Sequence, residues 1–318
     1  MVTPLRLALA SLLPLLALLA LLTLLRTVGG LDNGVARTPA MGYSSWNDCA
    51  SAVTERRIKN VTRHLISTGL AAKGFVHVNV DEGWLKSRNA TTGALVEDFD
   101  KFPSGMKALG DWIHDQVVPG KGKIMKYGLY TCRGTCQCST KQYQGPGGHG
   151  HESQDAQWFA DAGADYLKVD SCCGDQDHGV AFSDYGKWRD GLNATGRPVI
   201  FSLCGWHTWY APQGSALGNS WRIAGDGTNW GALSNCINLN APLQKFAGPG
   251  AWNDPDLLQG TGVGSNDKST NPQGCFDKAN IPQAEAWYQT EGQSRAQFSL
   301  WCVMSAPLLI SADVGQVS

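Results

Sequence analysis

The sequence has few charged residues for its length, and they form no block of one sign. Only 17% of its 318 residues are charged, and 26 Lys and Arg against 27 Asp and Glu give a formal net charge of −1. Without a basic patch, the electrostatic footprint of a nucleic-acid-binding protein is missing. We therefore expect no nucleic-acid partner.

Two common cofactor-binding patterns are also absent. The Gly-rich run 145–151 lacks the residues of a phosphate-binding loop and is predicted to be a plain loop. His149, His151 and His207 have no carboxylate at metal-ligand spacing, and the cysteines of 132–138 match no standard zinc pattern. The sequence thus predicts neither a metal nor an organic cofactor. We interpret these histidines as loop residues or as contacts at the rim of a substrate site.

The N-terminus carries a long apolar run. Leu and Ala dominate after Arg6, and small residues near Gly30 permit cleavage. This pattern predicts a signal peptide over 1–30 and a mature chain over 31–318. An uncleaved anchor is the alternative, since the run approaches the ~20 residues that span a bilayer, but Pro14 interrupts it. We expect no stable membrane association after cleavage.

Ten cysteines in an exported chain favour disulfides, because the compartment is oxidising. Glycosylation sequons at Asn60, Asn89 and Asn193 fit the same compartment. The protein is therefore expected to be secreted or to reach a lumen of the lysosome or vacuole type. Twelve Trp residues are compatible with sugar ligands, although Trp also fills cores.

Short apolar runs alternate with helical patterns along the whole mature chain. The segment from Thr54 to Leu70 places apolar residues on one helical face with Thr54 as its cap, and 153–162 is a second such helix. Eight strands alternating with helices most simply close into an α/β (β/α)₈ TIM barrel. The predicted strand ends are 43–46, 78–82, 127–130, 167–170, 201–204, 221–226, 252–256 and 308–311.

Polar residues gather at these strand ends, where the active face of such a barrel lies. We expect them to converge on one pocket; they are Asp81, Lys168, Asp170, Cys204, Arg222, Asp226 and Asp254. The long segment 259–282, rich in Gly, Ser, Asn and Asp, follows the seventh strand and is expected to shape subsites beyond the cleaved bond.

Two of these carboxylates suit glycoside hydrolysis. The period of two along a strand points Lys168 and Asp170 to the same side, so Lys168 is predicted to keep Asp170 ionised as a nucleophile. Asp226, in a Gly-Asp-Gly turn, is the predicted acid/base. Trp46 and Trp206 would form the wall of the pocket. A retaining mechanism requires carboxyl groups about 5–5.5 Å apart.

The chain resembles the α-galactosidases of glycoside hydrolase family 27. The segment 166–170 is similar to the family's nucleophile strand and 221–226 to its acid/base segment. The resemblance implies a retaining exo-glycosidase for terminal α-linked galactose, with a galactoside or related glycan as its substrate partner. It also implies a sugar-binding set, which comprises Trp46, Asp81, Glu82, Tyr130, Lys168, Cys204, Trp206, Arg222, Asp254 and Leu257.

The chain departs from the family where two aspartates are usually followed by a cysteine, since it has Asp81, Glu82 and Gly83. The extra methylene of Glu82 would stand where galactose carries its exocyclic CH₂OH, a difference worth ~1–3 kcal/mol, and favours a β-L-arabinopyranosidase as an alternative. Cys49, whose family partner is the missing cysteine, is expected to be free or paired elsewhere. By resemblance Cys138 pairs with Cys172, and other pairings stay open.

Two further alternatives follow from the same comparison. Gly205 lacks a side chain that could crowd a 2-acetamido group, which suggests an α-N-acetylgalactosaminidase. After 306–311 only seven residues remain, so we expect the closing helix and the family's C-terminal β-sandwich to be absent, leaving a seam of apolar barrel surface. That expectation supports an inactive sugar-binding homologue as a rival from another class.

Overall fold

The structure, a computed structural model, describes residues 33–139, 145–227, 229–260 and 289–314. One parallel sheet runs in the order β10-β1-β2-β5-β6-β7-β8-β9. Hydrogen bonds from Leu258 N to Leu309 O (2.9 Å) and from Ser311 N to Leu258 O (2.8 Å) join its two edges into a barrel. The strands are β1 Met41–Ser44, β2 His77–Asn79, β5 Lys126–Cys132, β6 Tyr166–Asp170, β7 Ile200–Cys204, β8 Ser220–Arg222, β9 Trp252–Asp254 and β10 Leu308–Ile310.

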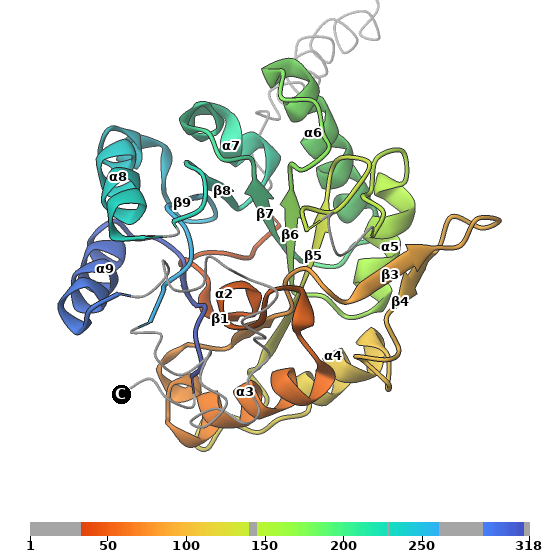
Figure 1. The fold of residues 1–318 in the computed structure, drawn as a ribbon, viewed down its shortest axis with the longest axis horizontal. Coiled ribbons are helices and arrows are strands. Elements are labelled where there is room, and N and C mark those ends of the chain that lie inside the picture. The colour runs from red at the N-terminus through yellow and green to blue at the C-terminus, as the bar shows by residue number, and fades with distance from the viewer. Residues whose placement is uncertain (1–32, 140–144, 228, 261–288, 315–318) are drawn as a thin grey trace, which may run out of the picture.

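Helices surround this sheet, as Figure 1 shows in a view that looks into the barrel. An antiparallel hairpin of β3 (Leu85–Arg88) and β4 (Leu95–Glu97) projects at one side. The predicted barrel and its eight strands are confirmed. The helices are α2 Trp46–Cys49, α3 Glu55–Ser67, α4 Met106–His114, α5 Glu152–Asp161, α6 His178–Ala194, α7 Ala211–Leu217, α8 Trp230–Asn240 and α9 Glu291–Val303, with 3₁₀ turns at 50–52, 71–73, 208–210 and 241–246.

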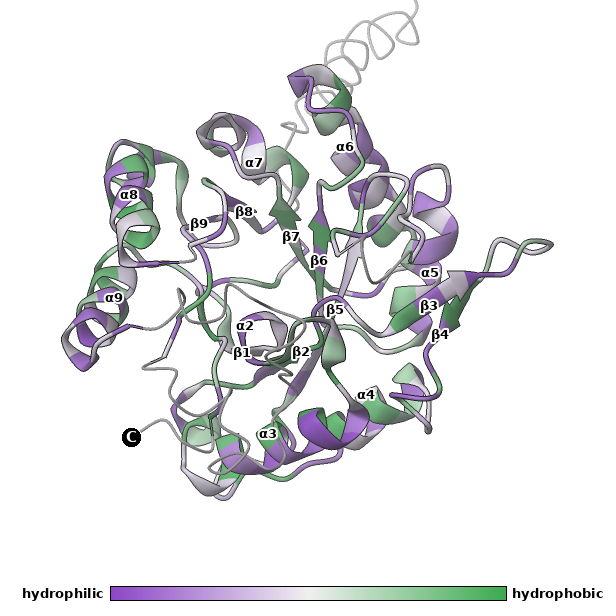
Figure 2. Cartoon of the chain, in the orientation of Figure 1, coloured by the Kyte–Doolittle hydropathy of each residue, from purple (hydrophilic) through white to green (hydrophobic). Residues whose placement is uncertain are grey.

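The helix predicted from Thr54 onward shows why these segments pack as they do. Thr54 caps α3 by accepting a hydrogen bond from Arg57 N at 3.3 Å. Ile58, Val61 and Leu65 are fully buried on one face of α3, while the opposite face is polar. Figure 2 shows hydrophilic residues in purple and hydrophobic residues in green on the surrounding helices. The apolar stripe therefore turns each helix toward the barrel.

The core explains many of the twelve Trp residues. Trp84, Trp188, Trp221 and Trp301 are fully buried within it, so they are packing residues and not ligand contacts. No helix in the described ranges is long and apolar enough to cross a membrane. The predicted signal peptide lies outside the described residues.

Candidate active site

A cavity of about 230 Å³ opens at the carboxyl ends of the strands. Residues from β5, β6 and β8, and from segments that follow β1, β2, β7 and β9, reach it, so strands far apart in the sequence supply one site. Its lining consists of Trp46, Asn47, Asp81, Glu82, Tyr130, Cys138, Lys168, Asp170, Cys172, Trp206, Arg222, Asp226, Gly227, Asp256, Leu257 and Gln259.

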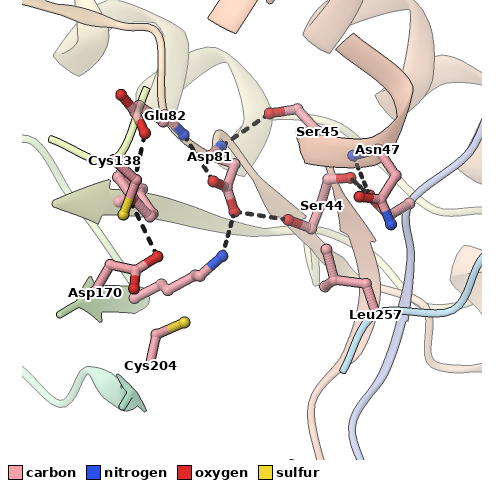
Figure 3. A network of polar contacts seen from close by, with 12 residues as sticks. Ser44, Ser45, Asn47, Asp81, Glu82, Cys138, Asp170, Cys204 and Leu257 are labelled. Carbon is pink, nitrogen blue, oxygen red and sulfur yellow. Dashed lines mark hydrogen bonds and ion pairs between the residues drawn. The ribbon is translucent and has the colours of Figure 1, made fainter. Parts of the chain in front are cut away.

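Asp81 is held by four contacts at the end of β2. Its Oδ2 accepts hydrogen bonds from Lys168 Nζ at 3.0 Å and from Ser44 Oγ at 3.3 Å. Its Oδ1 accepts one from Glu82 N at 2.9 Å, and its own amide donates to Ser45 Oγ at 2.9 Å. Figure 3 shows Asp81 between Glu82 and the two serines. The carboxylate is only 3% exposed, so its orientation is fixed.

Asp170 ends β6 and presents its carboxyl group to the same cavity. Ser171 N donates to Oδ1 at 2.8 Å, and Tyr130 Oη donates to Oδ2 at 3.1 Å. Burial raises the pKa of Asp170, and Lys168 offsets this rise only in part. Lys168 thus favours the ionised form of Asp170, although its ammonium pairs directly with Asp81 and burial has the larger effect on the pKa of Asp170.

Arg222 joins two further carboxylates of the cavity, Asp226 and Asp256. It lies 3.2 Å from Asp226 Oδ1 through Nη2 and 3.0 Å from Asp256 Oδ1 through Nη1. Burial tends to raise the pKa of Asp226, but Arg222 and then Lys168 outweigh it and lower the value. Burial raises the pKa of Asp256 to about 6 although Arg222 opposes the change. The side chain of Asp226 is 64% exposed, whereas that of Asp256 is buried.

Asp256 holds its position in a strained backbone conformation. Its φ is +106°, which non-glycine residues rarely adopt. Its carboxylate accepts hydrogen bonds from Gly227 N at 2.6 Å and from Leu257 N at 2.7 Å, and Trp301 Nε1 donates to its carbonyl at 2.8 Å. These contacts fix the strained turn and aim the carboxylate at Arg222.

Glu82 is 1% exposed and turns its carboxylate toward Ser139. The Ser139 amide lies 3.0 and 3.1 Å from the two carboxylate oxygens, and the Ser139 hydroxyl donates to Oε1. Tyr130 Oη lies 3.5 Å from Oε2. Burial raises the pKa of Glu82 to about 7, although the Ser139 hydrogen bonds act in the opposite direction.

Comparisons with known proteins identify the family of this chain. Residues 38–276 match the family model described as Alpha galactosidase A. The chain belongs to this family. The alpha-galactosidase of Cyamopsis tetragonoloba is 35% identical over 287 residues, which are 89% of this chain and 61% of that protein. The chain thus spans about three fifths of the length of that curated relative.

Two solved structures of the alpha-galactosidase family superimpose on most of the chain. A putative alpha-galactosidase from Bacteroides fragilis has a TM-score of 0.74 and 32% identity, covering 89% of this chain and 57% of that one. The Saccharomyces cerevisiae alpha-galactosidase with raffinose has a TM-score of 0.72 and 29% identity, covering 90% of this chain and 61% of that one.

The structure brings the predicted site residues together with two exceptions. Cys204 and Asp254 are not among the residues that line the cavity. Cys204 is buried with its Sγ 3.9 Å from Arg222 Nη1, and Asp254 accepts the Asp256 amide at 2.9 Å and borders a small cavity deeper in the barrel. Asp254 faces this smaller cavity, which shares Asp81, Lys168 and Arg222 with the larger one, because β9 ends at Asp254 and the chain turns before Asp256.

Sequence reasoning missed several lining residues, of which Asp256 matters most. It lies two residues after Asp254, and which of these two aspartates lines the cavity depends on where β9 ends. Asn47, Gly227 and Gln259 carry no pattern that marks them. Cys138 and Cys172 line the wall as well as pairing with each other. The predicted subsite segment 259–282 lies outside the described residues from 261 onward.

The room expected beside Gly205 for a 2-acetamido group is already filled. A Cβ atom on Gly205 would lie 1.9 Å from Tyr210 Cε2, and Tyr210 is fully buried. Gly205 leaves space for this ring and not for a ligand, so the α-N-acetylgalactosaminidase alternative loses its physical support. Gly83 is also constrained, since its φ is +124° and a Cβ atom would lie 2.6 Å from Ser51 O.

The cysteines are largely paired around the site. The disulfide Cys138–Cys172 is present as the resemblance implied, and Cys136–Cys173 is a second one beside it. Cys49 is disulfide-bonded, so the option of a free Cys49 is wrong. Free thiols in the described ranges are those of Cys132, Cys204, Cys236 and Cys302.

One histidine has neighbours that its sequence spacing did not indicate. His149, Glu152 and Asp184 bring ligand-type atoms within 4.8 Å of one another. Asp184, however, already pairs with Arg133 at 3.0 Å and with Lys187 at 3.1 Å. Cys138, Asp170 and Cys172 form another such group, but its two sulfurs are joined in a disulfide.

Proposed function

We propose that this chain is the catalytic barrel of a retaining exo-glycosidase that removes terminal α-linked galactose. The observation that carries the proposal is that Asp170 and Asp226 line one cavity together with Asp81, Lys168 and Arg222. Two separate carboxyl groups and a set of polar sugar contacts are the parts that glycoside hydrolysis requires. Membership of the alpha-galactosidase family supports the choice of galactose.

Asp170 acts as the nucleophile in the first step. Its two oxygens each receive one hydrogen bond, from Ser171 N and from Tyr130 Oη, so the carboxylate is oriented before the sugar arrives. It attacks the anomeric carbon, the bond to the leaving oxygen breaks, and a covalent glycosyl-enzyme forms. Lys168 favours the ionised form of Asp170.

Asp226 acts first as an acid and then as a base. It donates its proton to the leaving oxygen and then removes one from the water that hydrolyses the glycosyl-enzyme. In the free site desolvation is outweighed by Arg222, which lowers the pKa of Asp226, and the Asp226 side chain is 64% exposed. A bound sugar would cover this exposed carboxyl group and raise its pKa by desolvation, as protonation of the leaving group requires.

Hydrolysis of an aryl α-galactoside tests the proposal. We expect turnover by the unmutated chain, an α-configured first product by NMR, and loss of turnover with retained galactose binding in Asp170→Ala. An inverted first product would overturn the retaining mechanism. Galactose binding without turnover in the unmutated chain would instead identify an inactive sugar-binding homologue.

A second candidate substrate is a β-L-arabinopyranoside, which is favoured by Glu82. This residue reaches the cavity with one methylene more than the aspartate of the family pattern and is fully buried there. A longer side chain leaves less room for an exocyclic CH₂OH, which arabinopyranose lacks. Comparing kcat/KM for the two aryl glycosides decides between the substrates.

We also propose that the protein follows the secretory pathway to the outside or to a lysosomal or vacuolar lumen. The disulfides Cys136–Cys173 and Cys138–Cys172 support an oxidising compartment. Among the sequons, Asn89 and Asn193 are exposed and Asn60 is half-buried on α3. Glycosidase-sensitive bands on expression in eukaryotic cells, lost on Asn89→Gln and Asn193→Gln, test this route.

A further inference from the structure

We propose that Ser139 is a positioning residue that fixes Glu82 and thereby decides which pyranose the cavity accepts. The inference rests on the proposed function, since it takes the segment of Asp81 and Glu82 to be the wall near the sugar's exocyclic carbon. It concerns a contact between Glu82 and Ser139 and not the extra methylene of Glu82 by itself.

Ser139 supplies the short polar contacts of the Glu82 carboxylate. The Ser139 amide faces both oxygens, at 3.0 and 3.1 Å, and the hydroxyl donates to Oε1. The other polar neighbour, Tyr130 Oη, is 3.5 Å away and has a shorter contact of 3.1 Å to Asp170. None of the ion pairs among the described residues includes Glu82. The carboxylate therefore depends on Ser139 for its position.

Ser139, in turn, is anchored independently of Glu82. The preceding residue, Cys138, is bonded to Cys172 in the segment that follows β6, and Cys136 is bonded to Cys173 beside it. The Gln137 side chain donates to Pro146 O at 3.1 Å and its amide to Gly145 O at 3.0 Å. Because covalent bonds hold this segment, Ser139 positions Glu82 and not the reverse.

The contact also requires the length of a glutamate. Shortening the side chain by one methylene would withdraw the carboxylate by roughly the length of a C–C bond, about 1.5 Å. Hydrogen bonds of 3.0 Å would then be lost, since they fail beyond about 3.5 Å. Glu82 and Ser139 therefore form a matched pair, because the carboxylate of an aspartate at position 82 would not reach Ser139.

Held in this way, Glu82 forms a rigid part of the cavity wall. Its oxygens are occupied by Ser139, so it offers little to a sugar hydroxyl, and its buried stem limits the space at that end of the cavity. Release of the carboxylate would let the side chain turn aside and make room for an exocyclic CH₂OH. Loss of the Ser139 hydroxyl removes one of the two groups that hold the carboxylate and loosens it in this direction, so it is expected to favour galactosides over arabinopyranosides.

A double-mutant cycle tests the proposal. The measured quantity is the ratio of kcat/KM for 4-nitrophenyl α-D-galactopyranoside to kcat/KM for 4-nitrophenyl β-L-arabinopyranoside. It is to be compared among four proteins: the unmutated chain, Ser139→Ala, Glu82→Asp and the double variant. Ser139→Ala is expected to raise the ratio about 10-fold, the effect of losing one hydrogen bond. In the Glu82→Asp background, which by itself raises the ratio ~10-fold or more, the same change is expected to have no effect.

Two controls separate positioning from a general loss of structure. Ser139→Thr keeps the hydroxyl and should preserve the original ratio. Thr135→Ala removes an exposed hydroxyl from the same disulfide-bonded segment and should change nothing. An unchanged ratio in Ser139→Ala, or an equal change in both backgrounds, would overturn the proposal while leaving the glycosidase assignment intact.

Absence of all hydrolysis in the unmutated chain would overturn the proposed function instead. Calorimetric dissociation constants for free D-galactose and L-arabinose, measured in the same four proteins, would then report on the cavity directly. The same pattern of ratios in these constants would support the role of Ser139, and ratios that do not change or no binding at all would overturn it.

Discussion

The ammonium group of Lys168 donates its hydrogen bond to Asp81, at 3.0 Å, although Asp170 lies two residues further along the same strand. The strand pleat puts Lys168 and Asp170 on one side, but the long lysine side chain extends over Tyr130 of the neighbouring β5 to Asp81, which follows β2. Lys168 therefore serves two carboxylates in different ways. It pairs directly with Asp81 and acts on Asp170 only through its charge.

Replacement of Lys168 by Met should move the acidic limb of the pH profile of kcat/KM upward. Burial raises the pKa of Asp170 and Lys168 lowers it in part, so removal of Lys168 lets that pKa rise further. The nucleophile must be ionised, and a higher pKa therefore costs activity at low pH. We also expect a loss of about 10²-fold at the optimum. Lys187→Met, on the half-exposed outer side of α6, is the matched control, and an unshifted limb would contradict the electrostatic role.

Asp256→Asn should impair protonation of the leaving group. Arg222 divides its charge between Asp226 and Asp256, so neutralising Asp256 leaves Arg222 to act on Asp226 and lowers the pKa of the acid further. The basic limb of kcat/KM should move to lower pH, with a loss of about 10²-fold for a phenyl galactoside. A dinitrophenyl galactoside, whose leaving group needs no proton, should be affected far less. Equal losses for both substrates would mean that Asp256 serves binding alone.

The sequence predicts the barrel because each strand is an apolar run of the right length between helical patterns, and those patterns are local. It also predicts most lining residues, since the carboxyl ends of all the strands lie on one face of the barrel and the polar residues there are close to one another. Asp256 could not be distinguished from Asp254 because the end of β9 and the positive φ of Asp256 depend on contacts with Gly227 and Trp301, which are distant in sequence.

The contacts of Glu82 with Ser139 and of Gly205 with Tyr210 could not be predicted from the sequence, for the same reason. Ser139 lies 57 residues after Glu82, and no periodicity relates the two positions. The ring of Tyr210 lies near Gly205 in sequence, but whether it points inward depends on packing against Phe182 and Tyr185 of α6. Residue type at a strand end can thus be read from the sequence, whereas the partner that orients it requires the fold.

Gly205→Ala should destabilise the barrel. The new Cβ atom would lie 1.9 and 2.0 Å from Cε2 and Cζ of the buried Tyr210 ring, so either the ring or β7 must move. Overpacking of this kind costs about 1–3 kcal/mol. Urea unfolding should show a lower midpoint, whereas Gly248→Ala, where a Cβ atom meets nothing within 4 Å, serves as the control. An unchanged midpoint would mean that Tyr210 does not fill the space beside Gly205, which could then hold a group of the ligand.

Glu82→Gln should flatten the dependence of stability on pH. Burial raises the pKa of Glu82 from 4.5 to about 7, so between these values the folded chain binds more protons than the unfolded chain. The contribution of Glu82 to the free energy of unfolding is complete below pH 4.5 and declines as the pH rises to about 7, by up to about 3 kcal/mol.

A glutamine does not titrate, and its carbonyl oxygen can still accept the Ser139 amide. The free energy of unfolding of Glu82→Gln relative to the unmutated chain should therefore increase between pH 5 and pH 7.5, as measured by urea denaturation at a series of pH values. Glu291→Gln, an exposed position on α9, should leave the profile unchanged. If the profiles of Glu82→Gln and the unmutated chain run parallel, Glu82 is ionised throughout this range, and its contacts with Ser139 then outweigh the effect of burial on the carboxylate.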